Sequence, residues 1–513
     1  MKKCHNLLGR SFTRREQKMV GTGALITFLL IVVSICTVFQ EWANLPSPLD
    51  IIRSPGIVEV AKKNTLADDK SNGDTRSSGQ QQLVVQHSSR KKPKKTKNRT
   101  LTGIPKETTT SIGIDRVELK QRKRTLSAMC RKGGISEFCD LKGDIRIDPN
   151  PPIVYYVVPT EAADNNVTSS LTIKPYARND NAGAMESVRE WTVKVVPKNH
   201  PDLPHCSRVH DSPGVIFSLA GFCGNVFHSF SDVLIPLFAT ARPFNRQVKL
   251  LITDYRKWFI NKFIPILQAL SRYEMVDIDD VQEDGKNIHC FSRLTLGLKG
   301  RQSNELSINT SESEFTIIDF KKFLRSAYSL RKTTAIKLQD GGKKLAPVLL
   351  IITRRRTRAL RNVEEVERMA VQLGFNVTIA EIDANVSKSA EVINSCDVVL
   401  GVHGAALTNM VFLPENAVQI QVVPFDTDWI AKNAYGDPTK DMGVRYLEYK
   451  IGIEESSLSK KYPPDHAVLT NPKLFVKQGW KAWSSIYMDN QNVTLDMNRF
   501  KPTLLKALEL LHQ

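Results

Sequence analysis

Three short stretches of the chain carry side chains that could bind an anion or move a proton. The first runs from Gly401 to Asn409, includes His403 and Gly404, and follows an apolar run typical of a buried strand. Where a strand gives way to a helix, backbone N–H groups and the helix dipole form an anion site, and glycine lets a phosphate approach the backbone closely. The stretch is therefore either a phosphate-binding turn, with His403 donating to an oxygen, or a tight turn in which His403 has only a structural role. It lacks the G-x-G-x-x-G pattern of NAD sites.

The second stretch is a basic segment, residues 353–362, directly after the apolar run 347–353. Side chains at the carboxyl end of a strand point into the crevice where open α/β sheets bind ligands. Arginine suits a pyrophosphate because its planar fork makes paired, charge-assisted hydrogen bonds. Arg354 and Arg358 are the candidates, and the alternative is a solvated basic loop.

The third stretch, residues 221–232, places His228 and Asp232 four residues apart on a predicted helix. That spacing puts both side chains on one helical face. Either residue could act as the general base that takes a proton from an acceptor hydroxyl. The alternative is a capping and core-polar arrangement.

Two further segments are weaker candidates. Asp277-Ile278-Asp279 has the D-x-D form that many metal-dependent glycosyltransferases use, but three-residue patterns are common, and we interpret it as a strand end with solvated acids. A polar and aromatic segment at 448–449 and 461–466 could line an acceptor groove or form a surface loop.

Apolar strands that alternate with amphipathic helices surround these stretches, which predicts βαβ units and parallel sheets. Two such sections predict two Rossmann-like domains facing a cleft, with Asn362 and Gly374 as the caps of a helix at 363–373. The terminal helix, 502–511, is expected to cross back onto the first domain. The predicted strands are 153–158, 248–253, 347–353, 375–379, 396–400 and 418–423, and the predicted helices include 257–270 and 320–330.

The charge distribution argues against a nucleic-acid-binding protein. The formal net charge of the 513 residues is +19, but residues 1–150 hold 28 Lys and Arg against 14 Asp and Glu, a net of +14. The remaining body is close to balance, whereas a nucleic-acid-binding fold carries its basic surface on the folded domain.

An uncharged run, Met19–Phe39, is long enough at about 1.5 Å per residue to cross a hydrocarbon core of about 30 Å. The residues before it are mainly basic, so the N-terminus is expected to face the cytosol and the rest of the chain the lumen. The run is longer than the apolar region of a cleaved signal peptide, which favours an uncleaved signal-anchor. Residues 40–148, polar and basic, are predicted to form a largely disordered stem.

Two patterns agree with a lumenal body. Six cysteines follow the anchor, which allows three disulfides in an oxidising compartment, and Cys130 and Cys139 could close a small loop. Six N-glycosylation sequons also follow it, at Asn98, Asn166, Asn309, Asn376, Asn385 and Asn492.

The candidate stretches, in order, resemble plant glycosyltransferase family 61, the xylan-decorating group. The resemblance lies in GFCGNVFHSFSDVLIPLF (221–238), HCF with GLKG (289–300), TRRRTR and a following Asn (353–362), GVHGAALTNMVFLPENAVQIQVVPF (401–425) and EYKIGIEESSLSKKYPPDH (448–466). It implies a GT-B fold, a single-pass Golgi membrane protein, and inverting transfer from a UDP-sugar without an essential metal or other cofactor. The donor side would comprise Arg354, Arg358, Asn362, His403, Gly404 and Asn409, and the acceptor side would comprise Asn225, Glu448, Asp465 and His466 beside the catalytic Asp232 or His228.

These inferences predict an α/β protein with a tail (1–18), an anchor (19–39), a stem (40–148), an acceptor domain (149–338) and a donor domain (339–513). The expected partners are a UDP-pentose, xylan or another glycan acceptor, the Golgi membrane and other Golgi transferases. Two alternatives stay open: a core β-1,2-xylosyltransferase of N-glycans, and a non-catalytic scaffold of a xylan synthase complex.

Overall fold

The computed structural model describes residues 126–159, 169–280, 287–301, 304–339, 346–382 and 385–513. The predicted anchor, the stem up to residue 125, and the sequons at Asn98 and Asn166 lie outside the described residues. By its contacts the chain divides into two units, 1–106 and 107–513, and every described residue belongs to the second. None of the helices in the described ranges has the length and hydropathy needed to cross a membrane.

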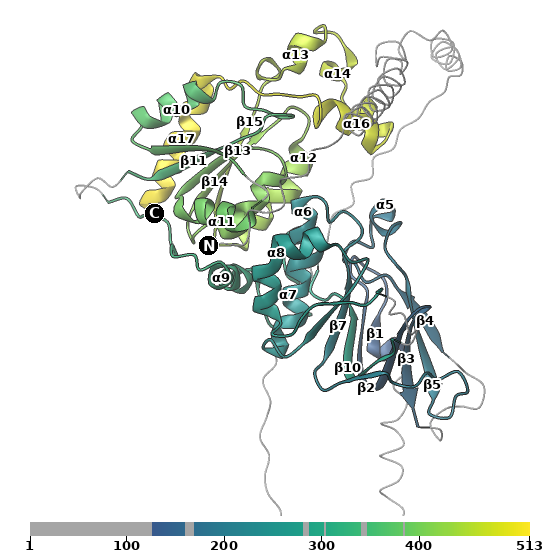
Figure 1. The fold of residues 1–513 in the computed structure, drawn as a ribbon. Coiled ribbons are helices and arrows are strands. Elements are labelled where there is room, and N and C mark those ends of the chain that lie inside the picture. Colours follow the sequence, from purple (N-terminus) through teal and green to yellow (C-terminus); the bar gives the residue numbers. More distant parts are fainter. Residues whose placement is uncertain (1–125, 160–168, 281–286, 302–303, 340–345, 383–384) are drawn as a thin grey trace, which may run out of the picture. The chain divides into compact units, whose positions relative to one another are not determined.

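The first part of the fold is built on a mixed sheet, drawn in blue and teal in Figure 1. Its strands follow the order β4-β5-β3-β2-β10-β7-β8-β9, with β1 paired to β2 and β6 to β10. The run β10-β7-β8-β9 is parallel, whereas β2 pairs with both β3 and β10 in antiparallel fashion. The strands are β1 (Cys130–Arg131), β2 (Phe138–Pro149), β3 (Pro152–Val158), β4 (Ser170–Ile173), β5 (Trp191–Pro197), β6 (Arg208–His210), β7 (Gly214–Ser218), β8 (Lys249–Thr253), β9 (Val276–Asp277) and β10 (His289–Gly297).

This sheet corrects two expectations. A wholly Rossmann-like first domain is wrong, because only half of the sheet has parallel pairing. The stem also ends earlier than residue 148, because β2 and the Cys130–Cys139 disulfide lie inside the stretch assigned to it. The helical segments of this part are α4 (Leu126–Met129), α5 (Ala182–Met185), α6 (Val226–His228), the π-helix η3 (Ser229–Leu234), α7 (Ile235–Ala241), η4 (Arg242–Phe244), α8 (Lys257–Leu270) and α9 (Ile317–Ala327).

The second part is a five-stranded sheet in the order β12-β11-β13-β14-β15, and each of its strand pairs is parallel. Its central strands β13 and β14 are buried along their whole length, as a sheet covered by helices on both faces requires. The strands are β11 (Val348–Thr353), β12 (Asn376–Glu381), β13 (Val398–Val402), β14 (Val418–Val423) and β15 (Arg445–Lys450). The predicted parallel sheet of the second domain is therefore confirmed.

Helices and short turns complete the second part. The predicted helix at 363–373 is α10 (Val363–Gln372), with Asn362 at its N-cap and Gly374 at φ 96° just past its end. The remaining segments are α11 (Val386–Ser395), the 3₁₀ helix η5 (Ala405–Phe412), α12 (Asp428–Ala431), η6 (Lys432–Gly436), η7 (Pro438–Lys440), η8 (Ile453–Glu455), α13 (Leu458–Lys461), α14 (Ala467–Thr470), α15 (Lys473–Lys477), α16 (Trp480–Tyr487) and α17 (Met497–His512).

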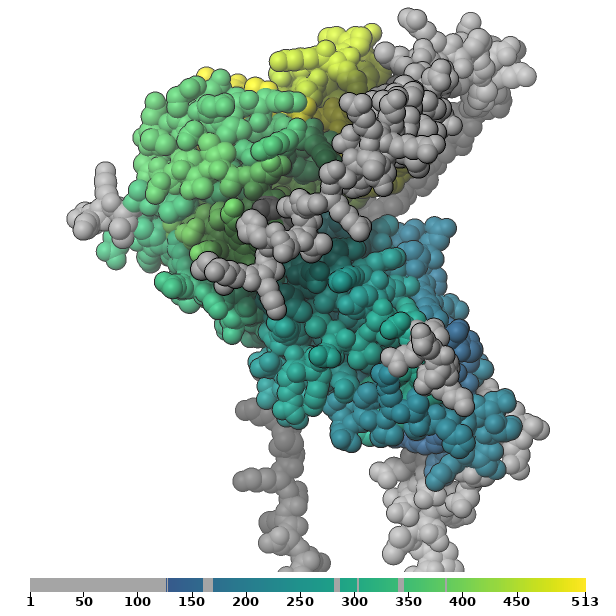
Figure 2. Space-filling model, viewed as in Figure 1, coloured from purple at the N-terminus to yellow at the C-terminus, as the bar shows by residue number. Residues whose placement is uncertain are grey.

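The C-terminal segment packs onto the second sheet. Helix α17 contacts α10, β14 and β15, and in Figure 2 the yellow C-terminal residues lie directly against the green surface of that part. The expectation that this helix crosses back onto the first domain is therefore wrong. Its buried face, which includes Phe500, Leu504 and Leu511, covers the strands of its own sheet instead.

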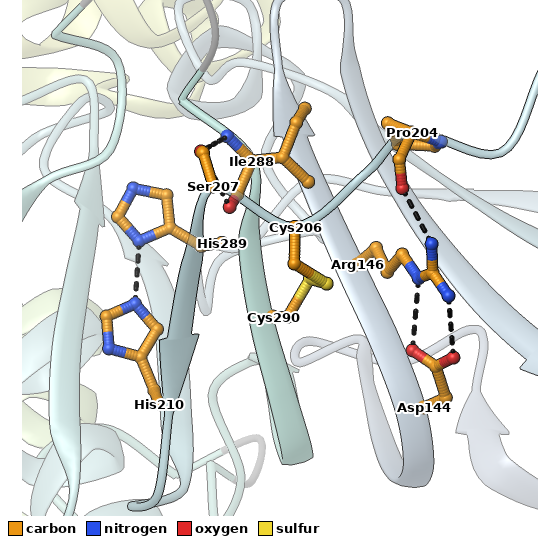
Figure 3. The surroundings of a disulfide bond; sticks show 9 residues. All are labelled: Asp144, Arg146, Pro204, Cys206, Ser207, His210, Ile288, His289 and Cys290. Atoms are coloured by element: carbon orange, nitrogen blue, oxygen red, sulfur yellow. Dashed lines mark hydrogen bonds and ion pairs between the residues drawn. A yellow bond between two sulfur atoms is a disulfide. The ribbon is translucent and has the colours of Figure 1, made fainter.

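Two disulfides, rather than the three that the cysteine count allows, form among the described residues. Cys130 pairs with Cys139, as predicted, and Cys206 pairs with Cys290 across 84 residues. Cys223 and Cys396 are free and buried. Figure 3 shows the second disulfide beside a hydrogen bond of 2.9 Å between His210 Nε2 and His289 Nδ1.

Candidate active site

The first half of the candidate site lies where α6 passes into the π-helix η3. Asn225 caps α6 by accepting from the Phe227 amide at 2.9 Å, so the predicted acceptor-side Asn225 has a capping role. A π-helical turn is uncommon and occurs frequently at functional sites. It leaves His228 and Asp232 in contact, with His228 Nδ1 at 2.9 Å from Asp232 Oδ2, which confirms that they share one face.

Asp232 is completely buried and is surrounded by hydrogen-bond donors. Arg178 Nε donates to Oδ2 and Arg178 Nη2 donates to Oδ1, each at 2.7 Å, while Tyr176 donates to Oδ2 at 2.9 Å. Arg301 Nη1 also donates to Oδ1. Tyr176, Arg178 and Arg301 were all missed in the sequence, because they come from two loops far apart in the chain, after β4 and after β10, with no local pattern.

These donors decide which of the two candidates can act as a base. Burial alone would raise the pKa of Asp232, but the hydrogen bonds from His228 and Arg178, and the charges of Arg301 and Arg178, hold the pKa far below its usual range. A carboxylate held this strongly in its charged form is a poor proton acceptor. Asp232 is instead placed to orient the ring of His228, whose side chain is 20% exposed.

A second carboxylate joins the same cluster. Glu305 Oε2 accepts from Arg178 Nη2 at 2.8 Å, from Arg301 Nη2 at 3.0 Å and from Ser231 Oγ at 2.6 Å. Two arginines and two carboxylates therefore neutralise one another in the interior. We call Arg178, Asp232, Arg301 and Glu305 the paired-charge cluster. Glu305 was missed in the sequence, although it follows closely after the GLKG stretch that ends at Gly300.

The second half of the candidate site lies at the carboxyl ends of β11 and β13. After β13, Gly404 adopts φ 153° and leads into the 3₁₀ helix η5, where the sequence had predicted an ordinary helix. A Cβ at Gly404 would collide with Arg354 Nη1 and lie 3.5 Å from Arg358 Nη2. Glycine is thus required here by both the backbone conformation and the two neighbouring guanidinium groups.

Arg354 and Arg358 come from the loop after β11, as the sequence predicts. Arg358 Nε donates to the His403 carbonyl at 3.0 Å, and Arg354 Nη1 reaches the same oxygen at 3.4 Å. Arg358 also donates to the Met488 carbonyl, and its backbone, at φ 53°, is held by an N–H bond to Gln491. Neither arginine forms an ion pair with any carboxylate in the described ranges.

Two cations held together without an ion-paired carboxylate destabilise each other, and the charge of Asp489 offsets this repulsion only in part. Burial, and then the charge of Arg354, lower the pKa of Arg358 to about 10. Burial also lowers the pKa of Arg354. An anion bound here would relieve this repulsion, which is the electrostatic property expected of a diphosphate site.

His403 is buried and its tautomer is fixed by its neighbours. Tyr446 donates to Gln421 Oε1 at 2.8 Å, so Gln421 Nε2 is the donor to His403 Nδ1, also at 2.8 Å. The proton of the neutral ring therefore lies on Nε2. Burial, followed by the charges of Arg358 and Arg354, lowers the pKa of His403 to about 3, so the ring is a neutral N–H donor at ordinary pH.

Tyr435 connects the two halves of the site. Its hydroxyl donates to the Gly404 carbonyl at 2.9 Å, and its ring lies 5.6 Å from the His403 ring and 5.8 Å from that of Phe227. Phe227 directly precedes His228 on α6. The candidate base and the glycine turn are therefore held by one shared set of aromatic contacts.

Two predicted donor-side residues have their amides engaged elsewhere. Asn362 exchanges hydrogen bonds of 2.9 and 3.0 Å with the backbone of Leu495, which anchors the C-terminal segment. Asn409 is buried and donates to the Ala406 carbonyl at 2.9 Å, which stabilises the turn of η5. Both residues support the site indirectly.

Of the three predicted acceptor-side residues near the C-terminus, Glu448 is hydrogen-bonded to Tyr446, the partner of Gln421, whereas Asp465 and His466 lie apart from these contacts. Glu448 is paired with Lys450 at 3.4 Å, and Asp465 is exposed. His466 caps α14 by accepting from the Val468 amide at 3.2 Å. Among the described residues, none of the three forms a hydrogen bond or an ion pair with the paired-charge cluster or with Arg354 and Arg358, and the capping bond gives His466 a structural role.

The D-x-D segment is occupied by structural contacts rather than solvated. Asp279 accepts from Arg189 Nη1 at 2.6 Å, from Thr253 Oγ1 at 2.9 Å and from the Asp254 amide at 2.6 Å. Asp277 accepts from the Asp279 amide at 3.1 Å. The interpretation of Asp279 as a solvated acid is therefore wrong. Its carboxylate bonds to residues at the end of β8 and so connects β8 to the loop after β9.

Four of the sequons lie within the described residues. Asn376 and Asn385 are exposed, and Asn385 also caps α11. Asn309 is buried, and Asn492 accepts from the Ala359 amide at 2.9 Å. Exposure therefore favours Asn376 and Asn385 as glycan sites over the other two.

Comparison with known proteins places this geometry in a family. The model of glycosyltransferase 61 matches residues 226–420, a range that contains His228, Glu305, Arg354 and His403. Beta-1,2-xylosyltransferase XYXT1 of Oryza sativa subsp. japonica is 38% identical over 73% of this chain and 82% of its own length. The chain belongs to glycosyltransferase family 61.

Other relatives include alpha-1,3-arabinosyltransferase XAT2 of the same rice, 40% identical over 73% of this chain, and xylan glycosyltransferase MUCI21 of Arabidopsis thaliana, 33% identical over 77% of this chain. The matched region spans 63% of the length of XAT2, against 81% for MUCI21.

Proposed function

We propose that this chain transfers a pentose, arabinofuranose or xylose, from a UDP-sugar to xylan. The observation that carries the proposal is the pair of half-buried Arg354 and buried Arg358, which has no ion-paired carboxylate among the described residues and lies against the Gly404 turn. Two of the relatives described above are named as an arabinosyltransferase and a xylosyltransferase, and the third as a xylan glycosyltransferase. Taken together, these names support a pentosyl donor and a xylan acceptor.

The proposed reaction is a single displacement with inversion. His228 Nε2 takes the proton of an acceptor hydroxyl while the hydroxyl oxygen forms a bond to the anomeric carbon of the pentose. The bond from that carbon to the phosphate oxygen breaks, and its electron pair leaves with UDP. Asp232 supports this role because its ionised carboxylate accepts from His228 Nδ1, which orients the ring and leaves Nε2 free to take the proton.

The donor side would meet the charge that develops on the departing UDP. Arg354 and Arg358 supply two positive charges, and His403 Nε2–H adds a neutral donor at the same turn. Such preorganised groups stabilise a leaving group electrostatically. In the proposed mechanism these groups carry that function without a metal ion.

The proposal includes a GT-B arrangement of the two domains and a location in the Golgi membrane. The parallel second sheet, with its ligand groups at the carboxyl ends of β11 and β13, supports a GT-B arrangement with the donor in the second domain. Two disulfides support a lumenal body, because they persist in oxidising compartments. The uncharged run Met19–Phe39 supports a signal-anchor in the Golgi membrane.

The test is an assay of the purified full chain against UDP-arabinofuranose and UDP-xylose, with xylo-oligosaccharides and an N-glycan glycopeptide offered side by side. We expect UDP release and a pentosylated xylo-oligosaccharide, and loss of both in Arg354→Ala although that variant folds. Transfer only to the glycopeptide would favour an N-glycan xylosyltransferase. No transfer by a folded, UDP-binding protein would favour a scaffold, and an active Arg354→Ala would overturn the donor site.

A further inference from the structure

Glu305 differs from the other carboxylate of the paired-charge cluster in how its two oxygens are used. Both oxygens of Asp232 accept hydrogen bonds, whereas all three donors to Glu305 converge on Oε2. Oε1 of Glu305 has no hydrogen-bond partner among the described residues, and the side chain is 18% exposed. We infer that Glu305 Oε1 receives a hydroxyl group of a bound sugar and so helps to position it beside His228, an inference that rests on the proposed function.

The charge balance indicates what kind of group this oxygen binds. Arg178 and Arg301 each contact both Asp232 and Glu305, so the negative charge of Glu305 is already matched. Burial would raise the pKa of Glu305, but the charges of Arg301 and Arg178 lower it, which keeps the group ionised. An ionised, already neutralised carboxylate has lone pairs to offer but little net charge to attract a cation. A neutral hydroxyl donor fits these properties.

The position of Glu305 agrees with a sugar subsite. Through the two arginines it is one hydrogen-bonded step from Asp232, which contacts His228. Glu305 also acts on Tyr435 electrostatically, because burial raises the pKa of Tyr435 and the charge of Glu305 raises it further. Tyr435 holds the Gly404 turn, and its ring lies 5.8 Å from that of Phe227, which precedes His228.

Ser231 fixes the orientation of the carboxylate. Its hydroxyl donates to Oε2 at 2.6 Å and accepts from Arg301 Nη1 at 2.9 Å, so the Glu305 side chain is held from the side opposite its open oxygen. A side chain that only balanced charge would gain by spreading its donors over both oxygens. The concentration on Oε2 leaves Oε1 preorganised for a ligand.

The hydroxyl can come from the acceptor sugar or from the donor pentose, and kinetics distinguish the two. The variants are Glu305→Gln, which removes the charge, and Glu305→Asp, which keeps the charge but, with its shorter side chain, moves the carboxylate oxygens away from the position of Oε1. The control is Glu415→Gln, which removes an ion-paired carboxylate elsewhere. For each full-length protein, KM is measured for UDP-pentose and for xylo-oligosaccharide, and UDP release is measured in the absence of acceptor. Oligosaccharide binding is measured by calorimetry, and the melting temperature reports on the fold.

We expect KM for the acceptor to rise about tenfold to a hundredfold in both Glu305 variants, as for a lost hydrogen bond to a charged group. A rise in KM for UDP-pentose instead would assign the hydroxyl to the donor sugar. The inference is overturned if both KM values and oligosaccharide binding are unchanged. It is also overturned if kcat alone is lost, or if Glu305→Asp melts like wild type and binds both substrates normally. If the wild type is inactive on every substrate pair, the proposed function is wrong. Calorimetry of the wild type and the variants then still tests whether Glu305 contributes to oligosaccharide binding.

Discussion

The two halves of the candidate site each hold a pair of arginines, of which only Arg354 is half-buried rather than buried, and the pairs differ in their partners. Arg178 and Arg301 form ion pairs with Asp232 and Glu305. Arg354 and Arg358 bond only to backbone carbonyl groups within the described residues. The first pair maintains a fixed internal charge, whereas the second pair lacks a counter-ion that a ligand can supply.

This difference separates structural from ligand-binding charges without reference to any bound molecule. A buried cation that is fully paired is costly to remove, because its partner is left unpaired. A buried cation without a partner is itself destabilising and is retained where function needs it. Loss of a paired arginine should therefore reduce stability, and loss of an unpaired one should reduce ligand affinity.

The largest expected effect is the loss of kcat when His228, the proposed base, is replaced. We expect His228→Ala to lower kcat for transfer by about 10²- to 10⁴-fold, the usual contribution of general base catalysis. The fold should survive, because Asp232 keeps both arginines and Tyr176. The measurement is steady-state transfer with UDP affinity determined in parallel.

The matched control for this variant is His466→Ala, which removes a helix-capping histidine outside the paired-charge cluster. It should retain most of the transfer activity. Equal losses in the two variants would contradict the assignment of His228 as the base.

The comparison between the arginine pairs is tested directly by Arg178→Met and Arg354→Met. We expect Arg178→Met to lower the free energy of unfolding by about 3–5 kcal/mol, because it leaves buried carboxylate charge uncompensated. Arg354→Met should change stability much less, since it removes repulsion from Arg358, but it should weaken UDP binding. Chemical denaturation and calorimetry of both variants measure the two effects.

A different result would remove the distinction between the pairs. If Arg354→Met were as destabilising as Arg178→Met, the second pair would be structural too. If Arg178→Met bound UDP as weakly as Arg354→Met while folded, the first pair would belong to the donor site.

A smaller effect is expected from Gly404→Ala. The added methyl group would meet Arg354 and require an unfavourable backbone conformation at φ 153°. Displacement of the guanidinium should weaken UDP binding by about tenfold, in line with a strain of about 1–3 kcal/mol. Gly374→Ala, also at positive φ but in open space, is the control, and similar UDP affinity in both variants would count against the turn as a binding element.

The smallest expected effect is a difference in acid sensitivity. The pKa of His403 is lowered from 6.5 to about 3 by burial and the two arginines, so below pH 6.5 the unfolded chain takes up a proton that the folded chain does not. The free energy of unfolding therefore falls as pH drops from 6.5 toward 3. The lowered pKa of Asp232 acts in the same direction but in a lower range: its contribution is fully present above about pH 4 and is lost only in stronger acid.

The measurement is the melting temperature at pH 7 and pH 5 for wild type and His403→Gln. The variant should show the smaller decrease, because His210 and His289, whose pKa values are also lowered to about 4 by burial and nearby charge, contribute equally to both proteins. An equal decrease would contradict the assignment of a buried, neutral His403.

The sequence predicted which residues meet at the second sheet better than which residues meet around α6 and η3, for a physical reason. Arg354, Arg358 and the Gly404 turn lie at the ends of β11 and β13, two neighbouring strands of a parallel sheet, so their proximity follows from strand pattern alone. His228 and Asp232 were found because helical spacing is local. The mixed pairing around β2 was not predictable, because the register of antiparallel strands depends on contacts far apart in the sequence.

The paired-charge cluster was missed for the same reason. Arg178 and Glu305 lie 127 residues apart and meet only because loops after β4 and β10 converge on η3. Neither residue belongs to a motif that marks its neighbours. The choice between His228 and Asp232 as the base depended on this cluster, and it therefore required the fold.

The central claim is that Arg354 and Arg358 form the binding site for the donor diphosphate, and UDP calorimetry on the full chain tests it most directly. Wild type should bind UDP with an affinity that falls as salt rises, and the double variant Arg354→Ala/Arg358→Ala should lose that binding while it keeps the melting behaviour of a folded protein. If the folded double variant bound UDP as tightly as wild type, the account of this site would be wrong.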